Sequence, residues 1–157
     1  MTELAWERGR TMRTPDGETL VADLWYPRDR GPLPTLLVRT AYGREVASAI
    51  TAPHPSVLAR AGYVVVSQDI RGRGDSTGTF TPFVHEAADG AAAIEWAAAL
   101  DVSNGDVGMY GFSYQGMAQL QAASAHPPAL RAIAPAMCSA DPGEGFLQCG
   151  GALRLGF

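Results

Sequence analysis

Residues 107–117, Val-Gly-Met-Tyr-Gly-Phe-Ser-Tyr-Gln-Gly-Met, decide how the rest of this sequence is interpreted. A short run of strand-forming residues over 107–110 leads into Gly-x-Ser, and a segment of helical composition over 115–125 follows at once. We therefore expect a sharp strand-to-helix turn with Ser113 at its apex. Gly111, two residues before the serine, leaves the space that such a turn needs.

A serine at this place is a candidate nucleophile. The turn would hold the Ser113 hydroxyl at a helix N-terminus, where the dipole and the free N–H groups favour a developing negative charge. The backbone N–H of Tyr114 would then be one donor to an oxyanion. The usual nucleophile motif has a second glycine at the position of Gln115, whereas here Gly116 comes one residue later. Taken alone, Gly-x-Ser also fits a simple turn that caps a helix.

The flanking segments predict an α/β fold. Residues 8–14 and 19–26 favour two strands joined by a Pro15-Asp16-Gly17 turn, hence an antiparallel hairpin. Further strands are expected over 35–39, 63–68, 107–110 and 131–135, and helices over 56–61, 86–100 and 115–125. This alternation indicates a mainly parallel sheet with helices on both faces. Such sheets bind ligands at the carboxyl ends of their strands.

Two further segments follow predicted strands and therefore fall at that edge. In the first, Tyr42 is a candidate second oxyanion donor, since a phenolic hydroxyl can replace a backbone N–H; an aromatic ring packed under the loop is the alternative. The second, residues 69–78, is rich in glycine, arginine and aspartate. Its glycine spacing does not fit G-x-G-x-x-G, which argues against a nucleotide-binding domain. We interpret it as a structured loop whose charges fix its shape.

Composition narrows the classes of protein further. The 157 residues are 46% hydrophobic and 18% charged with a net charge of −4, typical of a folded domain that binds neither nucleic acid nor membrane. Cys138 and Cys149 lack the spacing of zinc ligands, and we expect two free thiols, although a bridge between them is the alternative. The N-terminus does not read as a secretory signal, so a cytoplasmic location is expected.

Four segments together resemble the cocaine esterase and X-Pro dipeptidyl-peptidase family of α/β-hydrolases: RTAY at 39–42, GYVVVSQDIRGRGDSTG at 62–78, SNGDVGMYGFSYQG at 103–116 and PPALRAIAP at 127–135. The form Gly-x-Ser-Tyr-x-Gly is typical of that family. The resemblance implies the α/β-hydrolase fold and a serine hydrolase that cleaves a small-molecule ester or amide, with no cofactor and no metal. It implies Ser113 as nucleophile, with the Tyr42 hydroxyl and the Tyr114 N–H as oxyanion donors.

The other members of a catalytic triad are not found in this sequence. In this fold the acid and then the histidine follow the serine along the chain, whereas His126 precedes both Asp141 and Glu144. We expect residues 1–157 to be the N-terminal part of a catalytic domain with an incomplete sheet, and 141–157 to resemble the start of a cap region. The isolated chain is then expected to be inactive unless a second chain supplies the missing half. A non-catalytic ligand-binding remnant of the same fold is the alternative.

Overall fold

In the computed structural model, which describes residues 3–46, 52–141, 143–144 and 147–154, the chain opens with an antiparallel hairpin. Strands β1 (Leu4–Arg13) and β2 (Thr19–Pro27) pair from Leu4↔Pro27 to Arg13↔Thr19 across the predicted turn. β1 begins four residues earlier than expected because a bulge at Gly9 interrupts the strand pattern. The Gly9 N–H donates instead to the buried Asp23 carboxylate at 3.0 Å.

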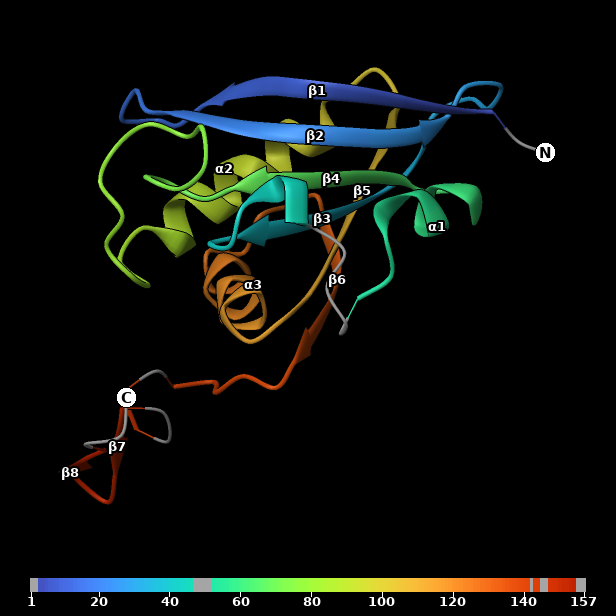
Figure 1. The fold of residues 1–157 in the computed structure, drawn as a ribbon. Helices are drawn as coiled ribbons and strands as arrows, with labels where there is room; N and C mark the ends of the chain where they lie inside the picture. Colours follow the sequence, from blue (N-terminus) through green and yellow to red (C-terminus); the bar gives the residue numbers. More distant parts are fainter. Residues whose placement is uncertain (1–2, 47–51, 142, 145–146, 155–157) are drawn as a thin grey trace.

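The remaining elements follow the predicted alternation of strands and helices (Figure 1). In chain order they are β3 (Leu33–Thr40), the 3-10 helix η1 (Arg44–Val46), α1 (Pro55–Arg60), β4 (Val64–Asp69), α2 (Glu86–Ala98), β5 (Ser103–Phe112), α3 (Tyr114–Ser124), β6 (Leu130–Ala136), β7 (Gln148–Cys149) and β8 (Ala152–Leu153). All the predicted elements are present. β5 starts four residues before its predicted start, since Ser103 to Asp106, which read as a turn, belong to the strand.

The six long strands form one sheet in the order β1-β2-β4-β3-β5-β6. β3 runs parallel to both β4 and β5, and β5 runs parallel to β6, whereas β2 joins β4 antiparallel. The prediction of a mainly parallel sheet preceded by a hairpin is therefore confirmed. Val64, Val65 and Val66 of β4 are all fully buried, as a strand covered on both faces requires.

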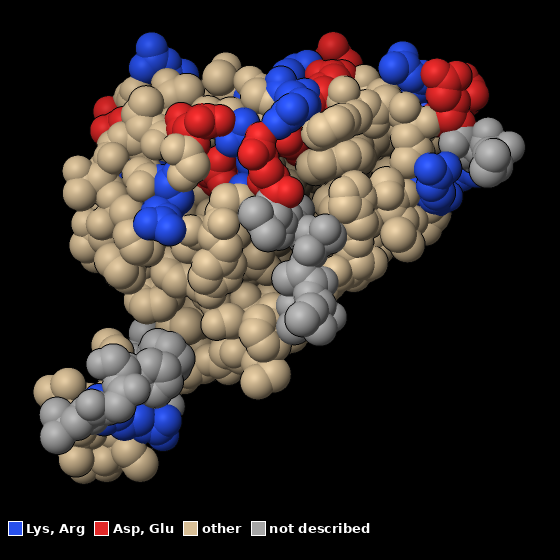
Figure 2. All heavy atoms as spheres, in the orientation of Figure 1, with Lys and Arg blue, Asp and Glu red and all other residues tan. Residues whose placement is uncertain are grey.

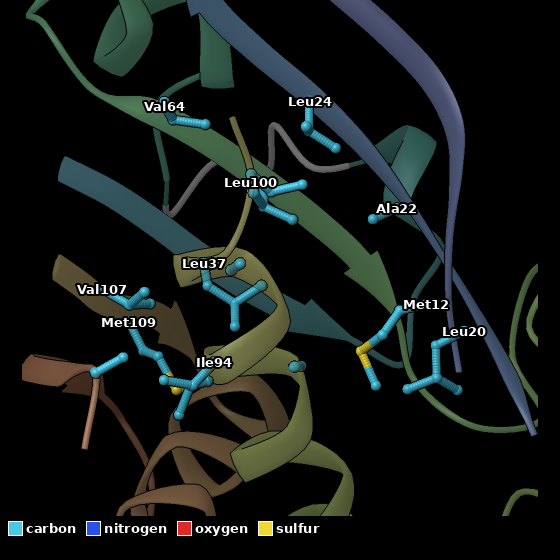
Figure 3. Packing of buried hydrophobic residues seen from close by; sticks show 14 of the residues in the cluster. Met12, Leu20, Ala22, Leu24, Leu37, Val64, Ile94, Leu100, Val107 and Met109 are labelled. Atoms are coloured by element: carbon cyan, nitrogen blue, oxygen red, sulfur yellow. The ribbon is translucent and has the colours of Figure 1, made fainter. Parts of the chain in front are cut away.

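Helices cover both faces of the sheet. α1 packs on β2 and β4, where Ala59 meets Trp25 and Val65. α2 and α3 pack against each other and on the opposite face, over a larger core that includes Leu37, Val64, Ile94, Val107 and Met109 (Figure 3). Ile94 of α2 reaches down onto the side chains of neighbouring strands, so the helix and the sheet share one apolar layer.

The carboxyl ends of three parallel strands meet at one edge of the sheet. β3 ends at Thr40, β4 at Asp69 and β5 at Phe112, and the segments that carry Tyr42, the charged loop and Ser113 follow directly. The fold therefore brings the three segments selected from the sequence to the same edge.

After β6, the chain leaves the sheet and ends in the small β7–β8 hairpin, which lies apart from the main body (Figure 1). The resemblance of residues 141–157 to the start of a cap stays a prediction. Cys138 and Cys149 are both free thiols, as expected. Within the described residues, no helix is long and apolar enough to cross a membrane.

Candidate active site

Ser113 occupies a strained turn between β5 and α3. Its backbone has φ 58° and ψ −118°, a left-handed conformation that residues with a side chain rarely adopt. The Ser113 N–H donates to the Ala136 carbonyl of β6 at 2.9 Å, and its carbonyl accepts from the N–H groups of Gly116 and Met117. Its side chain makes no capping hydrogen bond to α3. The hydroxyl is thus not used as a helix cap, contrary to the simpler interpretation of Gly-x-Ser.

The two glycines around the serine are both required by close contacts. A Cβ on Gly111 would lie 2.5 Å from the Gln115 Cβ, and one on Gly116 would lie 2.8 Å from the Cys138 Sγ. The Gln115 side chain meanwhile accepts the Phe112 N–H at 3.2 Å and so braces the turn. The late glycine therefore lets α3 approach the end of β6, while the residue at the usual glycine position has a structural role of its own.

Ser113 lines a cavity of about 270 Å³ together with Tyr42, Phe80, Pro82, Phe83, Tyr114 and Met117. The structure thus brings the three predicted site residues to one cavity. Tyr42 is 57% exposed, so its side chain is not buried under the loop, and its role as an oxyanion donor stays a prediction. Apart from the hydroxyls of serine and tyrosine, the described lining is made of apolar side chains, so the cavity suits an uncharged group.

Buried ion pairs hold the loop that carries Tyr42. The Tyr42 N–H donates to the Thr40 hydroxyl at 3.0 Å. Two residues on, the Arg44 guanidinium donates to Asp69 at 2.6 Å and to Asp23 at 2.9 Å, and all three side chains are buried. From the neighbouring loop, Arg73 donates to the Ala41 carbonyl at 2.8 Å. The Tyr42 ring therefore projects from a backbone that is fixed on both sides.

The charged loop at 69–78 has the structural role expected for it. Arg71 donates to Asp89 of α2 and to Asp16 of the first hairpin, and these two carboxylates raise the pKa of the guanidinium. Gly74 has φ +54°, and a Cβ there would lie 2.1 Å from an oxygen of Asp69. Basic and acidic side chains accordingly lie beside one another on the face drawn in Figure 2. The loop joins the hairpin, the sheet and α2 through its charges.

The Tyr114 side chain is buried in a second network. Its hydroxyl donates to Glu86 at 3.0 Å, and the other Glu86 oxygen accepts from Arg39 at 2.6 Å. Arg39 also donates to Gln68 at 3.1 Å. Burial, and then the nearby Glu86 carboxylate, raise the pKa of Tyr114 above its ordinary value. The residue after Ser113 is therefore tied to the ends of β3 and β4 and to the start of α2.

The family model described as X-Pro dipeptidyl-peptidase (S15 family) matches residues 16–157, nearly the whole chain. The chain belongs to this S15 family. The resemblance inferred from the sequence motifs is confirmed.

Relatives of this S15 chain are esterases and related hydrolases. It is 42% identical over 128 residues to a cocaine esterase from Rhodococcus sp. (strain MB1 Bresler), a match that covers 80% of this chain and 22% of the esterase. A CocE/NonD family hydrolase from Staphylococcus aureus superposes with a TM-score of 0.90 at 29% identity, over 99% of this chain and 31% of the other. An α-amino acid ester hydrolase matches with a TM-score of 0.76 at 25% identity, over 91% of this chain and 27% of the other.

These matches confirm the α/β-hydrolase fold and a family of hydrolases that includes esterases and peptidases. The S15 chain spans about a fifth of the length of the curated relative that it matches. Within the described residues, β6 is the last strand along the chain to join the six-stranded sheet.

The three histidines of the S15 chain lie at helix ends, not among the described residues that line the cavity. His54 caps α1 through a bond from the Ser56 N–H, and His85 precedes α2. His126 follows α3 at the end opposite Ser113, so the 11-residue helix, about 16 Å long at 1.5 Å per residue, lies between them. The histidines are surface or loop residues, as predicted.

Several residues that shape the site were not marked in the sequence. The sequence predicts Glu86 only as part of a helix, and Arg39 only as the end of a strand and the first residue of the RTAY segment, because a buried pairing between distant segments leaves no local pattern. Phe83 has φ 65°, a value that sequence rules would assign to glycine or asparagine. The one available signal was the charge of Arg39 and Glu86, since charged residues beside apolar runs are buried only when paired.

Proposed function

We propose that this chain carries the nucleophile half of a serine hydrolase that cleaves an ester or amide bond through an acyl-enzyme. The single observation that carries the proposal is the left-handed Ser113 at the β5–α3 turn, whose side chain lines a cavity with Tyr42. A non-glycine residue in this conformation persists only where the surrounding structure holds it, and such residues cluster at active sites. Membership in the S15 family supports the same reaction class.

In the proposed mechanism, the Ser113 Oγ attacks the acyl carbon while a histidine removes its proton. The carbonyl oxygen becomes an oxyanion and accepts hydrogen bonds from the Tyr42 hydroxyl and the Tyr114 N–H. Tyr114 is the first residue of α3, so its N–H has no partner within the helix and the helix dipole adds to the stabilisation. The protonated histidine then passes its proton to the leaving group, and water repeats the sequence on the acyl-enzyme.

The histidine of this mechanism lies outside these 157 residues, since none of the three present is at the cavity. We propose that it comes from further sequence or from a second chain, as does the acid that orients it. Removing one member of a triad costs about 10⁴ to 10⁶ in rate. The isolated chain is therefore expected to be nearly inactive, and the cytoplasmic location stays a prediction.

The apolar lining supports a substrate with an uncharged, bulky group next to the scissile carbonyl. Phe80 and Phe83 provide aromatic surfaces on which such a group can stack. The cocaine esterase and the α-amino acid ester hydrolase named above act on esters, by their names, which supports an ester ahead of a peptide.

Labelling with a fluorophosphonate probe, followed by peptide mapping, tests the proposal. We expect modification at Ser113 in a chain that has been joined to, or mixed with, the part of the Rhodococcus cocaine esterase that lies outside the match. Ser113→Ala abolishes the signal, whereas Ser124→Ala, at the far end of the same helix, leaves it unchanged. Labelling that persists in Ser113→Ala would refute the assignment. Binding of an ester without any Ser113 labelling would favour the ligand-binding remnant instead.

A further inference from the structure

The Tyr114 side chain holds a part of the cavity wall that no sequence pattern marks. Its hydroxyl donates to Glu86 at 3.0 Å and accepts the Phe83 N–H at 3.2 Å. The Phe83 and Tyr114 rings also stack, with centroids 4.6 Å apart and planes inclined by 23°. Tyr114 therefore holds Phe83 in two ways: its hydroxyl binds the Phe83 backbone N–H, and its ring stacks on the Phe83 ring.

Phe83 needs such support because its backbone is left-handed, with φ 65°. A bulky residue in this region is a genuine outlier and reverts unless its surroundings hold it. On the carboxyl side of Phe83, its carbonyl accepts a hydrogen bond from the Gln121 side chain of α3 at 3.1 Å. The backbone N–H and the backbone carbonyl of Phe83 are thus both hydrogen-bonded to side chains of α3, the helix that begins directly after the nucleophile.

The support behind Tyr114 is itself rigid. The Glu86 and Arg39 side chains are 4% and 0% exposed, and they are joined at 2.6 Å. Charge-assisted hydrogen bonds of this kind are short and strong. Burial raises the pKa of Tyr114, so its hydroxyl keeps its proton and continues to donate to Glu86 throughout the neutral pH range.

We propose that Phe83 is a specificity-determining residue, and that the Tyr114 hydroxyl is the positioning group that fixes it as the wall for an aromatic or similarly bulky group beside Ser113. The inference rests on the proposed function, because it takes this cavity as the place where part of the substrate lies. A wall that is already in place binds a ring with less loss of conformational freedom than one that must be ordered. The preference for a ring then depends on Tyr114, the residue directly after the nucleophile.

The test uses two ketones that cannot be hydrolysed, 4-phenylbutan-2-one and butan-2-one, which differ by the ring alone. Binding to the 157-residue chain is followed by the NMR signal of the Met117 methyl group, which lines the cavity. We expect the wild-type chain to bind the phenyl ketone more tightly. Tyr114→Phe removes one hydrogen bond to the wall and should weaken the phenyl ketone about three- to tenfold, without changing the affinity for butan-2-one. Amide hydrogen exchange at Phe83 should accelerate by a similar factor.

Two variants make the outcome decisive. Tyr110→Phe is the matched control, because the Tyr110 side chain packs with the cluster on the opposite face of the sheet. Its buried hydroxyl has no hydrogen-bond partner among the described residues. This variant should leave both affinities and the exchange rate unchanged. Phe83→Gly removes the ring and suits the left-handed backbone, so it keeps the test valid if Tyr114→Phe does not fold.

The proposal is overturned if the ratio of the two affinities is the same in the wild type, Tyr114→Phe and Phe83→Gly, or if the wild-type chain does not favour the ring. Neither readout requires turnover. A failure of fluorophosphonate to label Ser113 would therefore refute the proposed hydrolase, whereas the ketone affinities and the exchange rate at Phe83 would still test the role of Phe83.

Discussion

Replacing Glu86 with glutamine tests how far the fold depends on its buried charges. The substitution preserves the shape of the side chain but leaves the Arg39 guanidinium buried and charged, with neutral acceptors only. Among the described residues, the Arg39 Nη2 already has no hydrogen-bond partner, so the charge has little other compensation. Breaking a buried pair by removing one partner costs about 3–5 kcal/mol. For a domain of this size that corresponds to a fall in Tm of about 6–20 °C.

Urea denaturation followed by circular dichroism measures this cost and can separate the pair from its surroundings. In a double-mutant cycle with Arg39→Met, the double variant should be more stable than the sum of the two single changes by about 2 kcal/mol or more, because no unpaired charge remains. Asp106→Asn is the matched control, since its pair with Arg131 is 49% and 61% exposed and should be worth less than about 1 kcal/mol. Equal losses in Glu86→Gln and Asp106→Asn would refute the reasoning.

Gly111→Ala should lower the free energy of unfolding by about 3 kcal/mol in urea melts, through overpacking at φ +144°, whereas Gly105→Ala, with open space at φ +93°, should cost about 1 kcal/mol. Ser113→Gly should raise the free energy of unfolding by about 1 kcal/mol, since it relieves the left-handed strain, while it abolishes fluorophosphonate labelling; a loss of stability would contradict this. Hydrogen bonds from Arg71 hold the pKa of Asp16 well below its ordinary value of about 3.9, so their contribution is complete above pH 4 and is lost as the pH falls below it. Asp16→Asn should therefore flatten the acid side of a plot of Tm against pH, and an unchanged slope would count against the interaction.

The order of strands and helices followed from the sequence because apolar runs and turn residues are local signals. The β4 strand, the hairpin turn and the α1 helix were all identified in this way. The starts of β1 and β5 lie four residues earlier than the sequence predicts, since a bulge at Gly9 and the residues 103–106 resemble turns. In both cases pairing with a neighbouring strand overrides the local preference.

The candidate site could be predicted only as far as its motifs reached. Ser113, Tyr42 and Tyr114 lie at strand ends with recognisable neighbours, and the structure brings them to one cavity. Glu86 and Phe83 were missed because their roles arise from contacts with residues about 30 positions away. Neither a buried carboxylate that pairs across the core nor a left-handed phenylalanine has a signature within its own segment.

The two strained residues at this cavity are connected through one side chain. Ser113 and Phe83 both have left-handed backbones, and Tyr114 follows the first in sequence and holds the second by hydrogen bond and stacking. Strain of this kind costs about 1–3 kcal/mol per residue and must be offset by interactions around it. The Glu86–Arg39 pair behind Tyr114 is the buried interaction in position to offset it. Changes in that pair should therefore alter both the free energy of unfolding and the ligand selectivity. Changes in the ion pairs of Arg71 with Asp16 and Asp89, which involve neither strained residue, should alter the free energy of unfolding alone.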